Sequence, residues 1–226
     1  RVAIIGCGLL GQVYADLYSS FADTEIIAIA EYNPDRLGHV GEKYGVKALF
    51  PDAAALLREI EPDIAAVATP TKHYKEAVLA CAEAGVKGVS TDKPIAATLS
   101  DADEMVEVCA SRGVVFAGGN LQRAMNELQE AARMLRAGEF GEITGAAIHQ
   151  WGNGEISGGG CQHVSALRLL TGAEVEEVVA WATPEELLDS GSDHGLKVNA
   201  RFRMTSGVEC AVFSEPTPCQ GADVWT

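Results

Sequence analysis

The sequence predicts an α/β protein in which a doubly wound parallel sheet is followed by an α+β domain. Short apolar runs alternate with helical patterns up to residue 119, which is typical of parallel strands joined by crossover helices. These runs are continuously apolar, as strands covered on both faces are. Beyond residue 119, strand-like segments follow one another without helices between them, which favours an open, mainly antiparallel sheet. We therefore expect two domains, residues 1–119 and 120–226.

The chain begins with a strand, a glycine-rich turn, a helix and a second strand. The apolar run Val2–Ile5 stops at the turn GCGLLG, which occupies residues 6–11. Apolar residues then recur at helical spacing, and the next apolar run ends at Glu31. A strand, a turn with these three glycines and a helix form the fingerprint of a dinucleotide-binding Rossmann unit.

Each position of this fingerprint has a physical purpose. Gly6 allows the tight turn, Gly8 lets the main chain approach a pyrophosphate, and Gly11 lets the helix lie close to the strand. Glu31 lies twenty positions after Gly11, where a carboxylate accepts hydrogen bonds from the adenosine ribose. This carboxylate would repel a 2′-phosphate, so we expect NAD, with NADP as the alternative if Arg36 folds back towards it.

The rest of the first domain continues the alternation. Strands are expected over 46–50, 63–68, 86–90 and 114–117. Helices are expected over 34–44, 53–60 and 72–84, with Asp52 as the N-cap of the second of these. A fourth helix is expected to begin at a capping box formed by Ser100 and Asp103 and to end at Gly113.

In the second domain we expect helices over 126–137 and up to residue 170, after a glycine-rich stretch at 152–160, and strands over 142–151, 175–183, 197–205 and 208–214. Residues 221–226 read like a strand cut off in mid-course, so we expect this domain to be incomplete.

Composition narrows the class of protein. A net charge of −15 disfavours binding to nucleic acid or to an anionic membrane. No apolar run approaches the length of a bilayer span, and no signal segment precedes the first strand, so we expect a cytoplasmic protein. The six cysteines form neither a CxxC pair nor a cluster with histidines, so we expect no metal site.

Two further motifs follow strands of the first domain. In a doubly wound sheet, ligands bind beyond the carboxyl ends of the strands, where TPTKH (residues 69–73) and TDKP (residues 91–94) are expected. Lys93 could exchange a proton with a substrate oxygen, with Asp92 orienting its ammonium group. The alternative is that Lys93 only anchors the strand end or binds a phosphate as a fixed charge.

The order of these motifs resembles the glucose-fructose oxidoreductase, inositol dehydrogenase and MocA family (Gfo/Idh/MocA). The likeness includes GCGLLG with Glu31, TPTKH, TDKP, Gly119 with Arg123, GEFGEI, and a GGG run before a helix ending in LLTG. TDKP is similar to the family's EKP motif, which implies that Lys93 is the catalytic lysine. The resemblance also implies that the second domain is an open-faced sheet that covers the nicotinamide and holds substrate.

One departure from the family pattern concerns the second domain. Relatives carry D-x-G-x-H-x-x-D before the helix that ends in LTG, and the histidine there assists proton transfer. Counting back from residue 172 without gaps places Gln162 at the histidine position, and His163 follows one residue later. Either a one-residue shift brings His163 into the site, or Gln162 occupies it and hydrogen-bonds substrate. Adjacent helical residues point about 100° apart, so both cannot hold the same place.

These observations predict an NAD(P)-dependent oxidoreductase acting on a hydroxyl or carbonyl of a sugar, cyclitol or similar polyol. The alternatives are a non-catalytic dinucleotide-binding regulator and an NAD-assisted lyase or glycosidase. We expect a homodimer or homotetramer formed through the second-domain sheet. The catalytic residues would be Lys93 and His163, and substrate would be bound by Trp151, Gln162 and His163, although Trp151 could equally be a loop anchor. The expected cofactor-binding residues are Gly6, Gly8, Leu9, Leu10, Gly11, Glu31, Thr69, Pro70, His73, Asp92 and Lys93.

Overall fold

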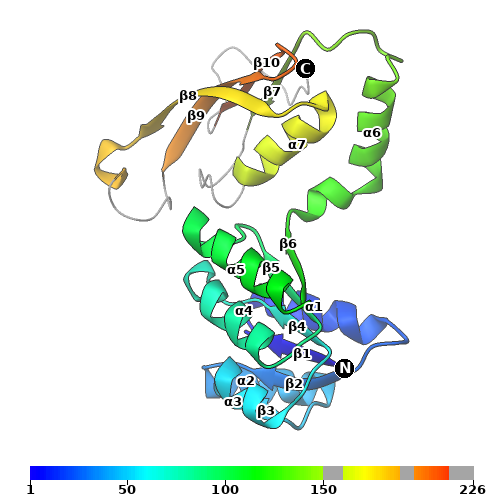
Figure 1. Ribbon diagram of the computed structural model, residues 1–226, viewed down its shortest axis with the longest axis vertical. Coiled ribbons are helices and arrows are strands. Elements are labelled where there is room, and N and C mark those ends of the chain that lie inside the picture. The colour runs from blue at the N-terminus through cyan, green and yellow to red at the C-terminus, as the bar shows by residue number, and fades with distance from the viewer. Residues whose placement is uncertain (150–159, 189–195, 214–226) are drawn as a thin grey trace. The chain divides into compact units, whose positions relative to one another are not determined.

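The computed structural model describes residues 1–149, 160–188 and 196–213. The chain folds into two compact units, Arg1–Gly119 and Asn120–Thr226 (Figure 1). Each unit has its own sheet and its own apolar core.

The sheet of the first unit has six parallel strands in the order β3-β2-β1-β4-β5-β6. This order confirms the predicted doubly wound fold, because the chain starts in the middle and winds outward in both directions. The strands are β1 (Val2–Ile5), β2 (Ile26–Ala30), β3 (Leu49–Phe50), β4 (Ile64–Val67), β5 (Gly88–Asp92) and β6 (Val115–Gly119).

Helices cover both faces of this sheet. They are α1 (Leu9–Ser20), α2 (Pro34–Tyr44), α3 (Ala53–Glu59), α4 (Tyr74–Glu83) and α5 (Leu99–Ser111). Val2 and Ile4 of β1 share a buried cluster with residues of α1 and α2, whereas Ala3 and Ile5 share one with residues of α3, α4 and α5. Because successive strand residues point to opposite faces, a continuously apolar strand fills both layers.

Several predicted boundaries match the structure. Helix α2 spans the predicted residues, with the Asn33 side chain accepting a hydrogen bond from Arg36 N and with Gly45 in the left-handed region at φ 70°. Asp52 caps α3, as predicted, by accepting a hydrogen bond from Ala55 N at 2.7 Å.

Other boundaries differ. The capping box predicted at Ser100 is wrong, because α5 is capped two residues earlier: Thr98 is extended at φ −134° and its Oγ1 accepts a hydrogen bond from Asp101 N at 3.1 Å. Strand β5 also starts and ends two residues later than expected. Asp92 is therefore the last residue of the strand. Helix α4 also begins two residues later than expected, because a short 3₁₀ turn at Thr71–His73 precedes it.

The second unit contains a four-stranded sheet in the order β7-β10-β9-β8. The pairs β10–β9 and β8–β9 are antiparallel and the pair β10–β7 is parallel, so the sheet is mixed and mainly antiparallel. Its elements are α6 (Asn126–Arg136), β7 (Gly145–His149), α7 (Cys161–Thr171), β8 (Val175–Thr183), β9 (Lys197–Met204) and β10 (Glu209–Phe213).

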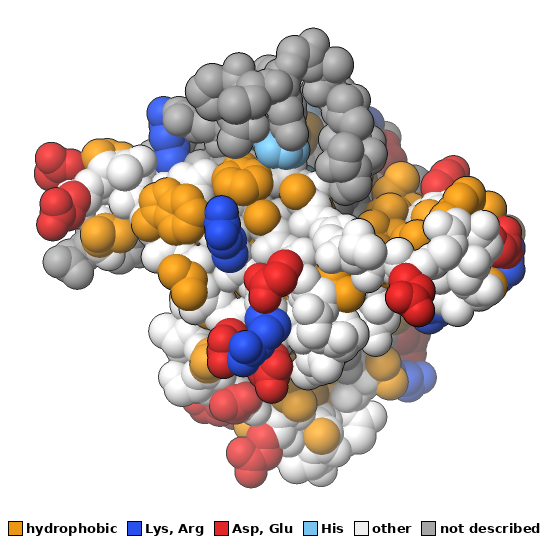
Figure 2. All heavy atoms as spheres, turned by 90° about the horizontal axis from the view of Figure 1, so that it is seen from above, with side chains coloured by type: hydrophobic (Ala, Val, Ile, Leu, Met, Phe, Trp, Pro, Cys, Tyr) orange, Lys and Arg blue, Asp and Glu red, His pale blue; other side chains and the backbone are white. Residues whose placement is uncertain are grey.

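Helix α7 packs on one face of this second sheet, where Leu167 shares a buried cluster with Phe202 and Val212. Cross-strand pairing places Val179 beside Arg201, one residue out of step with Phe202 and therefore on the opposite face. On that face Val179 is 68% exposed and Trp181 is 49% exposed. Figure 2 shows one face of the molecule, on which groups of hydrophobic side chains lie between acidic and basic ones.

Over the described residues, none of the helices is both long enough and apolar enough to cross a lipid bilayer.

Candidate functional site

The three motifs of the first unit come together at one edge of its sheet. The register pairs Ile5 of β1 with Val67 of β4, Val67 with Thr91 of β5, and Thr91 with Gly118 of β6. The glycine turn, TPTKH and the end of TDKP therefore leave neighbouring strands at the same level. This is the edge at which doubly wound sheets bind ligands.

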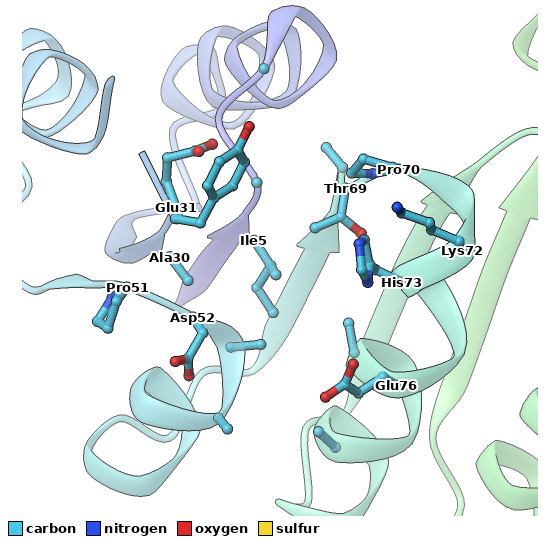
Figure 3. Close-up of a pocket in the computed structure, with 18 of the residues that line it drawn as sticks. Ile5, Ala30, Glu31, Pro51, Asp52, Thr69, Pro70, Lys72, His73 and Glu76 are labelled. Atoms are coloured by element: carbon cyan, nitrogen blue, oxygen red, sulfur yellow. The ribbon is translucent and has the colours of Figure 1, made fainter. Parts of the chain in front are cut away.

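A cleft of about 1010 Å³ opens at this edge (Figure 3). Glu31 and Asp52 lie on one side of it, and His73 and Glu76 lie on the other. Its polar and small residues follow four neighbouring strands: Gly6, Gly8, Leu9 and Leu10 after β1, Glu31, Tyr32 and Arg36 after β2, Pro51, Asp52, Ala53, Ala54 and Arg58 after β3, and Ala68, Thr69, Pro70, Lys72, His73 and Glu76 after β4.

Close contacts require glycine at two positions of the turn. Gly6 has a φ of +92°, and a Cβ on it would lie 2.7 Å from the carbonyl oxygen of Ala68. A Cβ on Gly11 would lie 1.9 Å from the carbonyl oxygen of Gly6, so only glycine lets α1 start this close to β1. A Cβ on Gly8, in contrast, would meet no atom of the chain within 4 Å. The space beside Gly8 is thus left for a ligand.

The start of α1 suits an anion. Gly8 is the N-cap and offers no side chain to cap the helix, and the first helical hydrogen bond runs from Gln12 N to Gly8 O at 3.1 Å. The N–H groups of Leu9, Leu10 and Gly11 therefore have no acceptor within the helix. Free N–H groups and the positive end of the helix dipole together attract a phosphate.

Glu31 is buried at the end of β2 although it lines the cleft. Its side chain is 2% exposed, and its Oε2 accepts a hydrogen bond from Cys7 N at 2.7 Å. Its Oε1 accepts hydrogen bonds from Asn33 N at 3.0 Å and from Arg36 Nη1 at 3.4 Å. Arg36 thus folds back onto Glu31. Burial, with the Glu31 charge as a second cause, raises the pKa of Cys7 to about 12 and keeps its thiol protonated.

The segment after β4 forms the opposite wall. Thr69 lines the cleft, and its buried Oγ1 has no hydrogen-bond partner among the described residues. Pro70 precedes the 3₁₀ turn that brings Lys72 and His73 to the cleft. An unpaired buried hydroxyl beside a cleft is a free donor or acceptor for a bound molecule.

The predicted cofactor residues therefore separate into two groups. Eight line the cleft: Gly6, Gly8, Leu9, Leu10, Glu31, Thr69, Pro70 and His73. The other three, Gly11, Asp92 and Lys93, do not line it. Gly11 packs against the Gly6 carbonyl and lets α1 start close to β1. Asp92 and Lys93 lie at the end of β5, which is two strands from β1. Sequence reasoning did not predict that Asp52, the N-cap of α3, Arg58 of α3 and Glu76 of α4 would line the cleft, because none of them belongs to a motif.

Lys93 follows β5 directly and is half-buried, with a cis peptide bond to Pro94. Two tyrosines that the sequence did not single out stand near Asp92. Burial, and next the Asp92 charge, raises the pKa of Tyr14 to about 12. The same two causes raise the pKa of Tyr74, against a hydrogen bond from the Asp92 main chain that lowers it. Both phenols are therefore neutral at physiological pH.

In the second unit, Gln162 and His163 are adjacent in the first turn of α7. The Asn120 side chain donates a hydrogen bond from Nδ2 to the carbonyl oxygen of Gln162 at 3.3 Å. Burial lowers the pKa of His163 below its usual value, which favours a neutral imidazole. Trp151 lies outside the described residues.

Gly119 and Arg123, which are similar to the family's glycine and arginine, lie at the end of the first unit and near the start of the second. Gly119 ends β6 with a φ of +137°, and Arg123 lies in the 3₁₀ turn Leu121–Ala124. Within the described parts of the chain, no group of three or more His, Cys, Asp or Glu side chains is placed to hold a metal ion.

Comparison with known families agrees with this architecture. Residues 1–119 match the GFO_IDH_MocA family, described as "Oxidoreductase family, NAD-binding Rossmann fold". The chain therefore belongs to this oxidoreductase family, and its first unit is the NAD-binding fold of that family.

Curated relatives are similar over part of their length. D-apiose dehydrogenase of Paraburkholderia graminis is 32% identical over 139 residues, which are 62% of this chain and 37% of that protein. D-glucoside 3-dehydrogenase of Escherichia coli is 32% identical over 172 residues, 71% of this chain and 49% of that protein. A third relative, 2,7-anhydro-N-acetylneuraminate hydratase of Mediterraneibacter gnavus, is 28% identical over 62% of this chain and 37% of that protein. The chain thus spans less than half the length of each of these relatives.

A solved structure of a probable dehydrogenase from Thermotoga maritima is similar over both units. It matches with a TM-score of 0.80 at 26% identity, covering 94% of this chain and 67% of that one.

Proposed function

We propose that this chain carries the cofactor site, and part of the substrate site, of an NAD-dependent oxidoreductase that acts on a hydroxyl or carbonyl carbon of a sugar, cyclitol or similar polyol. The observation that carries the proposal is the cleft at the carboxyl edge of the first sheet, which combines an uncapped helix N-terminus, a glycine turn and a buried carboxylate. The dehydrogenase relatives, whose names refer to a sugar and a glucoside, support the substrate class.

The site residues fit a dinucleotide along the sheet edge. The N–H groups of Leu9 and Leu10 would hold the pyrophosphate, and the cleft between Glu31 and His73 would hold the adenosine. Neighbouring strands are about 4.8 Å apart, so Lys93, two strands from β1, is roughly 10 Å across the edge. This separation suits the other half of the dinucleotide. NAD, when bound there, supplies the hydride acceptor or donor.

Glu31 favours NAD over NADP in this arrangement. A 2′-phosphate would lie beside a carboxylate that is held in place by two main-chain N–H groups. The half-exposed Arg36 guanidinium offsets only part of that repulsion, because it is already paired with Glu31 at 3.4 Å.

Lys93 would act as general acid/base. Its ammonium group would give a proton to the substrate oxygen during carbonyl reduction, and its amine would take one from the hydroxyl during oxidation. Asp92 would orient it from the end of β5. In the second unit, His163 or Gln162 would bind substrate, with Trp151 as a further substrate contact.

The test is turnover of Lys93→Ala on a panel of sugars and cyclitols, followed by NADH absorbance. We expect turnover to fall roughly 10²- to 10⁴-fold while NADH affinity changes little. Lys93→Arg is the matched control, because it keeps the positive charge but exchanges protons poorly, and it should be nearly as slow. Full turnover by Lys93→Ala would contradict the assigned role. Coenzyme binding without turnover on any substrate by the whole protein would instead support a regulator.

A second candidate is an NAD-assisted lyase or hydratase, in which transient oxidation acidifies a neighbouring C–H bond. The relative named as a hydratase favours it. Product analysis separates the two candidates, because this reaction forms product without net accumulation of NADH.

For assembly, we propose a homodimer or homotetramer formed through the face of the second sheet opposite α7, where Val179 and Trp181 are exposed. Light scattering would test it: the double variant V179K/W181K should be monomeric, and an unchanged mass would exclude this face.

A further inference from the structure

The contacts of Glu31 assign it a second task besides ribose binding. We propose that Glu31 is a positioning residue, whose carboxylate fastens the glycine turn to the loop after β2 before any cofactor binds. Its effect on the choice of cofactor rests on the function proposed above, whereas the fastening itself does not.

The two oxygens of the carboxylate face different segments. Oε2 accepts a hydrogen bond from Cys7 N, inside the glycine turn. Oε1 accepts one from the main-chain N–H of Asn33, the residue whose side chain caps α2. A carboxylate thus bridges two main-chain segments that are 26 residues apart in the sequence. The remaining contact, from Arg36 to Oε1, is longer and reaches a half-exposed side chain.

Burial makes these contacts necessary. A carboxylate that is 2% exposed has lost most of its water and is stable only if protein donors replace it. Two oxygens offer about four acceptor positions, and the three donors named above occupy three of them. The position that is left, on Oε2, is enough for one ribose hydroxyl. Three acceptor positions of the carboxylate therefore stabilise the fold, and one is left for the ligand.

Replacing Glu31 by glutamine separates this role from simple ribose binding. Glutamine has one oxygen and one NH₂ group, so one end must face an N–H donor without accepting from it. The oxygen fits better towards Asn33 and Arg36, which are two donors, and this leaves the NH₂ group against Cys7 N–H. Cys7 is buried, so its N–H then lacks a partner and the turn loosens.

The experiment is amide hydrogen exchange by NMR on the protein without cofactor, comparing wild type, Glu31→Gln and Arg36→Gln. We expect the Cys7 amide to lose roughly ten- to hundredfold of its protection in Glu31→Gln, and to keep it in Arg36→Gln. Glu107→Gln is the matched control, because it makes the same change on the exposed face of α5 and should leave Cys7 protected.

Cofactor affinity gives the second readout. By calorimetry, Glu31→Gln should bind NADH more weakly and NADPH no better than wild type, because the turn that holds the pyrophosphate is disturbed for both. If Glu31 acts only on the ribose, the Cys7 amide keeps its protection in Glu31→Gln and NADPH binding rises. That result would overturn the proposal.

Two further outcomes are decisive. If wild type binds neither coenzyme but Glu31→Gln still loses protection at Cys7, the fastening stands and the proposed function fails. If Glu31→Gln does not fold, wild type alone decides: the Cys7 amide must exchange more slowly than the amide of Leu9, the first N–H of α1, and equal rates contradict the proposal.

Discussion

The two sheets of this protein differ in which of their surfaces helices leave uncovered. The first sheet is covered by helices on both faces, so polar groups gather at the carboxyl edge of its strands, where the cleft lies. The second sheet is covered by α7 on one face, and its other face exposes Val179 and Trp181. In the first unit, the doubly wound topology therefore places the cleft at the carboxyl edge of the sheet. In the second unit, the location of a ligand depends on individual side chains.

Glycine substitutions test this dependence most strongly. Gly11→Ala places a Cβ against the Gly6 carbonyl, so we expect about 3 kcal/mol of destabilisation and a loss of NADH binding. Gly8→Ala is the matched variant, because its Cβ meets no atom of the chain, and it should unfold as wild type does while binding NADH more weakly. Urea unfolding and calorimetry measure both quantities. A stable Gly11→Ala variant would show that the turn is not tightly packed.

Separate cores predict separate losses of stability. Leu167 of α7 is 1% exposed, and truncating it to alanine should destabilise the second unit by about 2–5 kcal/mol. NADH binding by the first unit should persist. The fully buried Met105 of α5 is the counterpart, and Met105→Ala should destabilise the first unit to a similar degree. Unfolding monitored by amide exchange in each unit resolves the two. Equal losses of protection in both units for either variant would show that they unfold together.

Much of the first unit was predictable because its signals are local. The turn at residues 6–11, Glu31 at the end of β2 and the cap at Asp52 each depend on neighbours in sequence, and all occur where expected. The walls of the cleft at Arg58 and Glu76 were not predictable, because they depend on how helices α3 and α4 pack on the sheet.

The sequence of the second unit predicts its strand pairing and its site residues less fully. Its mainly antiparallel sheet was expected, but the parallel pairing of β7 with β10 joins strands about sixty residues apart and has no local sequence signature. The choice between Gln162 and His163 likewise depends on the orientation of α7, which the spacing of residues does not give. Sequence also placed the start of α5 two residues late, because Thr98 and Ser100 are both good caps and only the main chain decides between them.

The cap of α5 offers a smaller effect. Thr98→Ala removes the acceptor for Asp101 N and should cost about 1 kcal/mol of stability in the first unit. Ser100→Ala, two residues on, should cost less than about 0.5 kcal/mol. Urea denaturation of both variants checks the order, and a larger loss for Ser100→Ala would restore the capping box first predicted there.

A pH effect in the second unit is expected to be the smallest. Burial lowers the pKa of His163 below its usual value of 6.5, so between the folded pKa and about pH 6.5 the unfolded chain binds more protons than the folded one. The stability that neutral His163 contributes is complete above about pH 6.5 and is lost as the pH falls through the folded pKa. His163→Asn should flatten the pH dependence of unfolding in this range, whereas the exposed His39→Asn control should not. Identical slopes for wild type and His163→Asn would contradict the burial of its imidazole.

The central claim is that the cleft of the first unit binds NAD, and calorimetric titration of NADH tests it most directly. We expect one NADH per chain with a Kd on the order of 1–100 µM, towards the lower end of typical enzyme KM values, and weaker binding of NADPH. The absence of heat with either coenzyme at millimolar concentration would contradict the account.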